Sequence, residues 1–305
     1  MAILNDYNYE NFEKLKPFLL KNEFLMFEEE LLFSCVNGPH AKTTKAYIDS
    51  ENYLIKEKIH GTEYVAFNDK NQIIYKINSN GFRTKHFEKL KSKNTNILFL
   101  GCSFTSGVGL PEELIWTNQL IKMLDGKLPN INYYNLGLMG AGIDIIINNL
   151  RVFIDNYGKP DYIFILYPGV ERMILFFEDA QKFIQITSPA KFLTNKKESN
   201  LPEFVADFAK NTTIENLILS SIQKLHMVEL MCKNNGIKLF WGTWHEAYLE
   251  MYKHLNFNNY VPIPPRRFLD KNNENLPYWK EARDLSHPGS GYNQSIAKHF
   301  FNAIF

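Results

Sequence analysis

Short apolar runs alternate with segments of helical hydrophobic spacing from residue 95 to the C-terminus. The runs that begin near residues 97, 131, 162 and 237 have the length of strands. Apolar side chains recur every three or four positions in the segments 112–124, 143–157, 214–235 and 292–305. This alternation predicts an α/β/α sandwich built on a mostly parallel, right-handed sheet.

The first 94 residues follow a different pattern. Residues 7–33 place apolar side chains at helical intervals, and the runs 64–67 and 72–77 flank a polar turn, which predicts a hairpin. We therefore expect an N-terminal extension of helix and hairpin, residues 1–94, packed on an α/β domain formed by residues 95–305.

Composition excludes some classes of partner. A net charge of +1 over 305 residues gives no reason to expect nucleic acid or an acidic membrane as the main partner. The N-terminus lacks the features of a secretory signal, and no apolar run is long enough to span a bilayer. We expect a protein of the cytoplasm, or one carried on a virion. The odd number of cysteines, Cys35, Cys102 and Cys232, argues against a disulfide framework.

The first apolar run ends in a small-residue turn, Gly101-Cys102-Ser103. Ligands of open parallel sheets bind beyond the ends of such strands. The turn permits two interpretations: backbone amides that cradle an anion, or a serine nucleophile. It lacks the lysine of a phosphate-binding loop, and Thr105 stands where the Gly-x-Ser-x-Gly elbow requires glycine. Beside Ser103, Cys102 is interpreted as a small residue packed at the strand end.

A serine nucleophile needs a base, and the C-terminal region supplies one in Asp284-Leu285-Ser286-His287. The carboxylate of Asp284 can fix the tautomer of His287, which then accepts the serine proton. No pair of histidines has the spacing of a metal site with a matching carboxylate or cysteine.

Taken together, these two motifs resemble the SGNH/GDSL hydrolase family over residues 95–305, with further agreement at Gly291 and Ala297. The resemblance implies a flavodoxin-like, five-stranded sheet and no metal or organic cofactor. It also implies roles for individual residues: Ser103 as nucleophile, His287 as general base and then acid, and Asp284 as the group that orients His287.

The family pattern also suggests the oxyanion hole. The second sequence motif of the family, Asn-x-x-x-x-Gly, corresponds to Asn135 through Gly140. In the family the last glycine of this motif donates its backbone amide, so the resemblance implies that the amides of Ser103 and Gly140 hold the oxyanion. After the third strand the family has Gly-x-Asn-Asp, whereas this chain has Pro168-Gly169-Val170-Glu171-Arg172. The asparagine donor is therefore missing, or is replaced by a backbone amide or by Arg172. A surface pair of Glu171 with Arg172 is the alternative.

Two further residues are candidates for an auxiliary or substrate-binding role. The element Asn78-x-x-Gly81-Phe82-Arg83 is similar to one that often precedes the hydrolase domain in SGNH-like proteins. We expect a positive φ at Gly81, packing of Phe82, and a carboxylate near the site as partner of Arg83; an ordinary turn with a surface arginine is the alternative. His245, at the end of the fourth apolar run, is interpreted either as a substrate contact or as a structural histidine.

The resulting hypothesis is a serine esterase that removes a short acyl group, such as acetyl, from a carbohydrate or a related polar substrate. The choice of acyl group and sugar follows from the family resemblance alone. A catalytically weakened SGNH-like module that binds glycan, or that serves as a structural part of a phage particle, is the second hypothesis. O-acyl transfer to a sugar is the third, because the same triad serves both reactions.

Overall fold

The structure is a computed structural model that describes residues 46–49, 52–56, 74–177, 182–186, 212–255, 257–265, 282 and 287–305. The helix expected within residues 7–33, the strand expected at 64–67 and the predicted site residue Asp284 lie outside the described residues.

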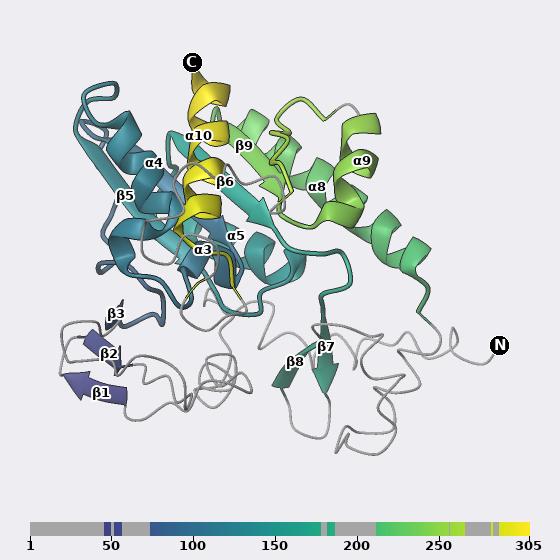
Figure 1. Cartoon of the computed structure of the whole chain (residues 1–305), viewed down its shortest axis with the longest axis horizontal. Coiled ribbons are helices and arrows are strands. Elements are labelled where there is room, and N and C mark those ends of the chain that lie inside the picture. Colours follow the sequence, from purple (N-terminus) through teal and green to yellow (C-terminus); the bar gives the residue numbers. More distant parts are fainter. Residues whose placement is uncertain are drawn as a thin grey trace.

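Four parallel strands form the central sheet, in the order β5-β4-β6-β9 (Figure 1). They are β4 (Thr95–Gly101), β5 (Ile131–Gly137), β6 (Tyr162–Tyr167) and β9 (Lys238–Thr243). The central strands β4 and β6 are almost entirely buried, which explains their continuous apolar sequences. Because the chain passes from β4 to β5 on one side and then crosses to β6 on the other, this is the flavodoxin-like order.

The expectation of a fifth strand is wrong for the described part of the chain. Beyond β9 a single parallel bridge joins Trp241 to Tyr260, with Trp241 N donating to Asn259 O at 3.0 Å and Val261 N donating to Trp241 O at 2.7 Å. Proline follows directly at residue 262. No further bridge to β9 forms among the described residues 261–265.

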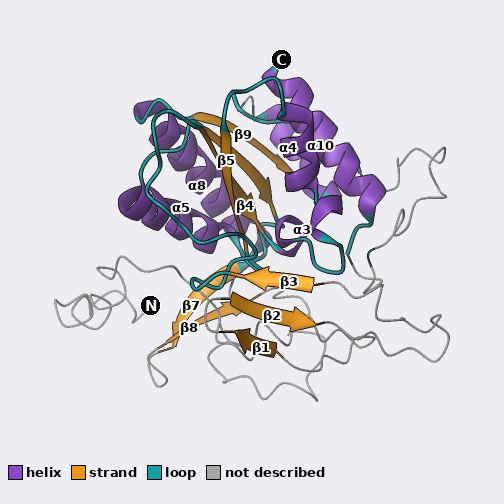
Figure 2. Cartoon of the chain, turned by 90° about the vertical axis from the view of Figure 1, so that its left-hand side faces the viewer, coloured by secondary structure: helices purple, strands orange, loops and turns teal. Residues whose placement is uncertain are grey.

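Helices cover both faces of the sheet (Figure 2). On one face lie α4 (Trp116–Leu124) and α10 (Ser290–Ile304). On the other lie α5 (Ile143–Tyr157) and α8 (Ile214–Asn234), with α9 (Glu246–His254) following β9. The four helical segments expected from the sequence are confirmed, except that residues 112–114 form a separate 3₁₀ turn, η2 (Glu112–Leu114), before α4.

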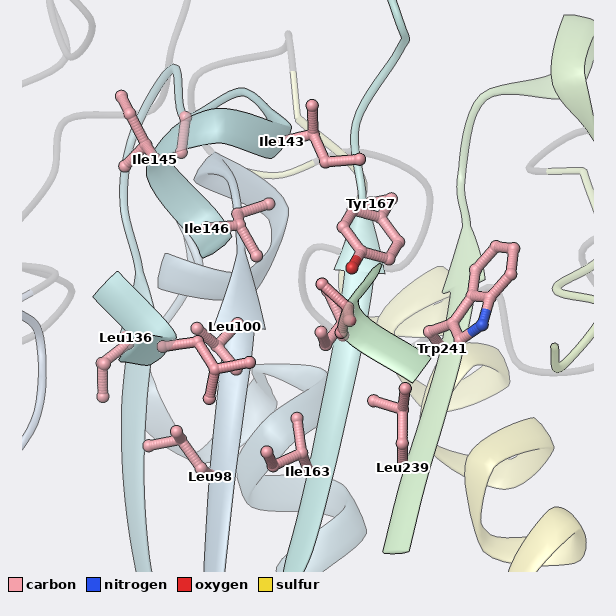
Figure 3. Close-up of a cluster of buried hydrophobic side chains, with 14 of the residues drawn as sticks. Leu98, Leu100, Leu136, Ile143, Ile145, Ile146, Ile163, Tyr167, Leu239 and Trp241 are labelled. Carbon is pink, nitrogen blue, oxygen red and sulfur yellow. The ribbon is translucent and has the colours of Figure 1, made fainter. Parts of the chain in front are cut away.

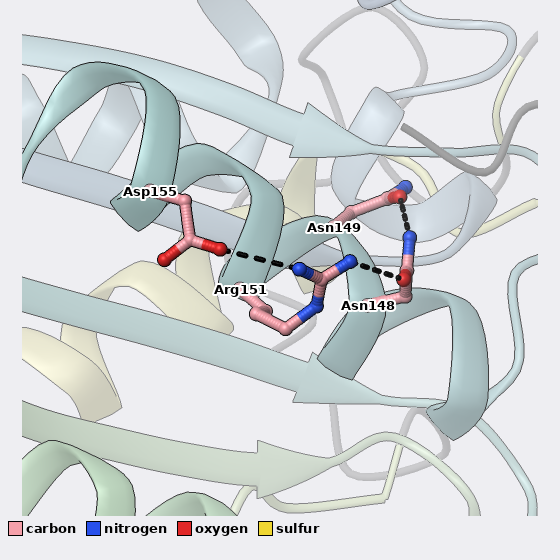
Figure 4. A network of polar contacts seen from close by, with 4 residues as sticks. All are labelled: Asn148, Asn149, Arg151 and Asp155. Carbon is pink, nitrogen blue, oxygen red and sulfur yellow. Dashed lines mark hydrogen bonds and ion pairs between the residues drawn. The ribbon is translucent and has the colours of Figure 1, made fainter. Parts of the chain in front are cut away.

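Alternate side chains of each strand enter two separate cores. Leu98 and Leu100 belong to the core beneath α5 and α8 (Figure 3), whereas Phe99 packs beneath α4 and α10. At its outer surface α5 carries a polar network in which Arg151 contacts Asp155 at 3.2 Å and Asn148 at 3.3 Å (Figure 4). Such exposed pairs add only a few tenths of a kcal/mol, so the buried faces hold the sandwich together.

Two small antiparallel sheets lie at the end of the molecule toward which the parallel strands run (Figure 2). One consists of β1 (Ala46–Asp49), β2 (Asn52–Lys56) and β3 (Ile74–Ile77), and the other of β7 (Met173–Phe177) and β8 (Lys182–Ile186). The described partner of β3 is β2, with Tyr53 opposite Ile77. None of the helices that the structure describes has both the length and the apolar composition needed to cross a bilayer.

Candidate active site

Ser103 begins a very short helix, α3 (Ser103–Ser106), directly after β4. Its carbonyl accepts hydrogen bonds from Gly107 N at 3.0 Å, Val108 N at 3.2 Å and Ser106 Oγ at 3.1 Å. The helix ends at Gly107, whose φ of 73° favours glycine. Ser103 is therefore held at the carboxyl end of β4, between β5 and β6, where the strand order reverses and where ligands of such sheets bind.

The end of β5 fixes α3 from the side. Asn135 Nδ2 donates to Thr105 O at 2.8 Å, and Asn135 Oδ1 accepts from Gly137 N at 2.8 Å. A side chain at Gly137 would meet the backbone of α3, because a Cβ there would lie 2.4 Å from Ser106 N. Asn135 and Gly137 thus allow and maintain a close approach between the serine helix and the neighbouring strand.

The candidate oxyanion residue Gly140 lies in a tight turn after β5. Leu138 N donates to Gly101 O at 3.0 Å, and Ala141 N donates to Leu138 O at 3.0 Å. Gly140 has a φ of 76°, in the region that favours glycine. This turn is bonded to Gly101, the last residue of β4, two residues before Ser103.

His287 stands just before α10, and its ring centre is 5.7 Å from that of Phe104. Since Phe104 follows Ser103 directly, the two motifs of the sequence come together at this point. Asn293 anchors the adjoining backbone: its Nδ2 donates to Pro288 O at 3.2 Å and to Gly289 O at 2.9 Å, and its Oδ1 accepts from Trp116 N at 3.0 Å. The sequence motif did not indicate this role of Asn293.

Glu171 and Arg172, after β6, contact different partners. Glu171 Oε2 accepts from the Tyr248 hydroxyl at 3.2 Å, and burial together with the Glu171 carboxylate raises the pKa of Tyr248 to about 12. Arg172 Nη1 donates to Ala141 O at 3.4 Å, and its guanidinium carbon lies 5.8 Å from the centre of the Trp244 ring. Arg172 is thus next to the Gly140 turn.

An aromatic strip, which we define as Phe104, Trp244, His245 and Tyr248, runs beside the serine helix. Trp244 stacks on Phe104 with ring centres 4.2 Å apart. The ring centre of His245 lies 5.4 Å from that of Trp244 and 4.6 Å from that of Tyr248. The Nδ1 atom of His245 is buried and has no hydrogen-bond partner among the described residues. His245 therefore packs within the strip, and the stack of Trp244 on Phe104 was not anticipated from the sequence.

The segment before β4 supplies Arg83. Gly81 has a φ of 84° and Phe82 is fully buried, as expected. The surface alternative for Arg83 is wrong, because this residue is only 4% exposed. Its guanidinium donates to the backbone carbonyls of Ser106, Gly107 and Leu110, all in or just after α3.

Within the part of the chain that the structure describes, no cluster of three histidine, cysteine or acidic side chains has a geometry that could hold a metal ion.

No family model matches the sequence, and no curated protein matches it. Several solved structures align with about two thirds of this chain. TesA aligns with a TM-score of 0.43 and 13% identity over 68% of this chain and 97% of its own. A variant of an acetylxylan esterase from Geobacillus stearothermophilus aligns with a TM-score of 0.41 and 13% identity over 72% of this chain and 96% of its own.

A lipolytic protein of the G-D-S-L family from Desulfitobacterium hafniense aligns with a TM-score of 0.39 and 15% identity over 69% of this chain and 99% of its own. These similarities are too distant to assign an activity.

Proposed function

We propose that the protein is a serine hydrolase of the SGNH/GDSL type that cleaves a short acyl ester, such as an acetyl group on a carbohydrate. The observation that carries this proposal is the contact between His287 and Phe104 at the carboxyl end of β4. Because Phe104 follows Ser103 directly, this contact supports a place for His287 near the serine hydroxyl. A serine beside an imidazole is the minimum requirement for nucleophilic attack on an ester.

In the proposed reaction, the Ser103 hydroxyl attacks the ester carbonyl while His287 accepts its proton. The amides of Ser103 and Gly140 stabilise the negative charge that develops on the carbonyl oxygen. His287 then returns the proton to the departing alcohol, which leaves an acyl group on Ser103. Water activated by His287 releases the acid and regenerates the serine. Asp284, which lies outside the described residues, orients His287 in this scheme.

The aromatic strip supports a substrate with a ring or another flat, partly apolar surface. Phe104 and Trp244 stack on each other and are both half-buried. The acetyl group and the carbohydrate remain a proposal that follows from the family resemblance.

Hydrolysis of an aryl acetate and labelling by a serine-directed fluorophosphonate test the proposal. Ser103→Ala and His287→Ala should each lose at least about a hundredfold in kcat/KM, and Ser103→Ala should not be labelled. Ser79→Ala and His254→Ala are matched controls, because both residues are exposed. A general-base mechanism predicts a rate that rises with pH, and a rate independent of pH would argue against it.

A folded wild-type protein that neither turns over nor becomes labelled would contradict the esterase. The catalytically weakened binding module would then be the better description. One observation favours this second function. The family has an asparagine donor after the third strand, and this chain has the segment that ends at Arg172 in its place. An added sugar distinguishes an acyltransferase from a hydrolase. The measurement is the amount of acylated sugar formed per ester consumed.

A further inference from the structure

We propose that Arg83 is a positioning residue for Ser103, so that the segment preceding the α/β domain completes the active site. The inference rests on the proposed function for its kinetic consequence, and on the hydrogen bonds of Arg83 for its structural part. It gives Arg83 a purpose that neither the sequence motif nor the reaction scheme assigns to it.

The turn that carries Arg83 is rigidly built. Asn78 Oδ1 accepts from the amides of Asn80 and Phe82 at 3.0 Å each, and Asn78 N donates to Phe82 O at 2.8 Å. Phe82 is fully buried in the core beneath α5, where its ring centre is 5.7 Å from that of Phe87. The turn is therefore pinned on both sides, which fixes the direction in which the chain presents Arg83.

The guanidinium of Arg83 joins this turn to the backbone that follows Ser103. Its Nη1 donates to Ser106 O at 3.2 Å and to Gly107 O at 2.7 Å, and its Nη2 donates to Leu110 O at 2.9 Å. The three acceptors lie within five residues of one another, and two of them belong to the end of α3. A single planar group thus fixes the shape of the loop that leaves the serine helix.

Helix α3 needs such a partner. The last carbonyl groups of any helix have no amide donor within the helix. A buried carbonyl that receives no hydrogen bond destabilises the fold. In α3 the carbonyl of Ser103 is bonded by amides that follow it, but Ser106 O lies at the point where Gly107 ends the helix. Arg83 supplies the donor there, and its positive charge suits a helix C-terminus.

Loss of these bonds should alter catalysis more than binding. A displacement of about 1 Å in a reacting group can lower a rate by about a hundredfold. Arg83 itself contacts the loop behind Ser103, so we expect a fall in kcat with little change in KM. Lysine offers one point charge in place of a planar fork, so it can satisfy only part of the set of carbonyls.

The experiment compares the full-length wild type with Arg83→Lys, Arg83→Met and Lys85→Ala. Lys85 is the matched control: it is exposed, lies on the same segment, and donates to Asn132 Oδ1 on β5 at 2.6 Å. For folded variants, kcat on an aryl acetate should fall by about a hundredfold in Arg83→Met and less in Arg83→Lys. Lys85→Ala should keep the wild-type kcat. A folded Arg83→Lys or Arg83→Met with unchanged kcat would overturn the proposal.

Hydrogen exchange provides a readout that does not depend on activity. The amides of Gly107 and Val108, which bond Ser103 O, should exchange faster in Arg83→Lys than in wild type, while amides of the central β6 should not change. If Arg83→Met does not fold, Arg83→Lys decides the question. Unchanged exchange at residues 107–108 overturns the positioning role, whereas an inactive and unlabelled wild type overturns the esterase, so the two failures are distinguishable.

Discussion

Replacing Gly137 with alanine tests whether the close approach of β5 to α3 determines the position of Ser103. A Cβ atom at this position would lie 2.4 Å from Ser106 N and 2.6 Å from the carbonyl carbon of Thr105, whereas ordinary contacts begin at 3.4 Å. The clashing atoms are backbone, so no side chain can rotate away. The serine helix and the strand end must therefore separate by about 1 Å.

The magnitude of the effect follows from this separation. Overpacking of a tight contact destabilises a protein by about 1–3 kcal/mol. The same movement strains the hydrogen bond from Asn135 Nδ2 to Thr105 O, which is 2.8 Å long. For catalysis, a displacement of about 1 Å corresponds to about a hundredfold in kcat/KM. We expect Gly137→Ala to show both effects together.

Gly126→Ala is the matched control for this prediction. Gly126 has a φ of 73° and no atom within 4 Å of an added Cβ, so alanine there is strained only by its backbone angle. It should lose about 1 kcal/mol of stability and keep its kcat/KM. Both variants are compared by urea unfolding and by aryl acetate hydrolysis. A Gly137→Ala protein with wild-type kcat/KM and no greater loss of stability than Gly126→Ala would refute the reasoning.

Three other predictions concern separate parts of the molecule. Asn293→Ala should lose about 1–3 kcal/mol in urea unfolding, because the buried amide of Trp116 loses its acceptor, and kcat should fall as the backbone beside His287 is released; no change in either would contradict the anchoring role. Burial and Glu229 raise the pKa of Cys232 from 9.0 to about 12, so its contribution to stability is complete below pH 9 and falls by about 1.4 kcal/mol per pH unit up to about pH 12. Cys232→Ala should therefore lose less stability than wild type between about pH 8 and about pH 10 in urea unfolding, and equal losses would exclude this thiol as the cause. If Arg172 replaces the missing oxyanion donor, Arg172→Ala should lower kcat by about a hundredfold with little change in KM, and Arg172→Asn should retain more of it; equal activity of both variants and wild type would exclude the role.

The parallel sheet and its covering helices could be predicted from the sequence because both depend on the periodicity of apolar residues. The run 97–100 is apolar at every position, since Leu98 and Leu100 face one core while Ile97 and Phe99 face the other. A strand that is covered on both faces has a continuous apolar sequence. The fifth strand was expected from the family resemblance alone, and a single bridge between Trp241 and Tyr260 has no periodic pattern by which the sequence could be judged.

Candidate residues of the site were found where chemistry requires a particular side chain in a particular local context. Ser103 follows a buried strand, and Gly140 adopts a positive φ, so each leaves a local signal. Asn135 and Arg83 stand in sequence motifs that do not show which backbone groups their side chains bond, and Asn293 stands in no motif that indicates a role. Each bonds backbone atoms far away in the sequence, and a pattern of side chains contains no information about which carbonyl will need a donor once the chain has folded.

These three residues share one physical task. A catalytic turn at the end of a strand has carbonyl and amide groups that neither the sheet nor a four-residue helix can pair, and burial denies them water. Asn135 bonds Thr105 O, Asn293 bonds Pro288 O and Gly289 O, and Arg83 bonds the carbonyls that follow α3. Because every such bond also fixes a position, the groups that satisfy the buried backbone are the same groups that hold Ser103 and the backbone next to His287 in place. Substitution of any of them should therefore alter rate and stability together, whereas substitution of Ser103 itself should alter the rate alone.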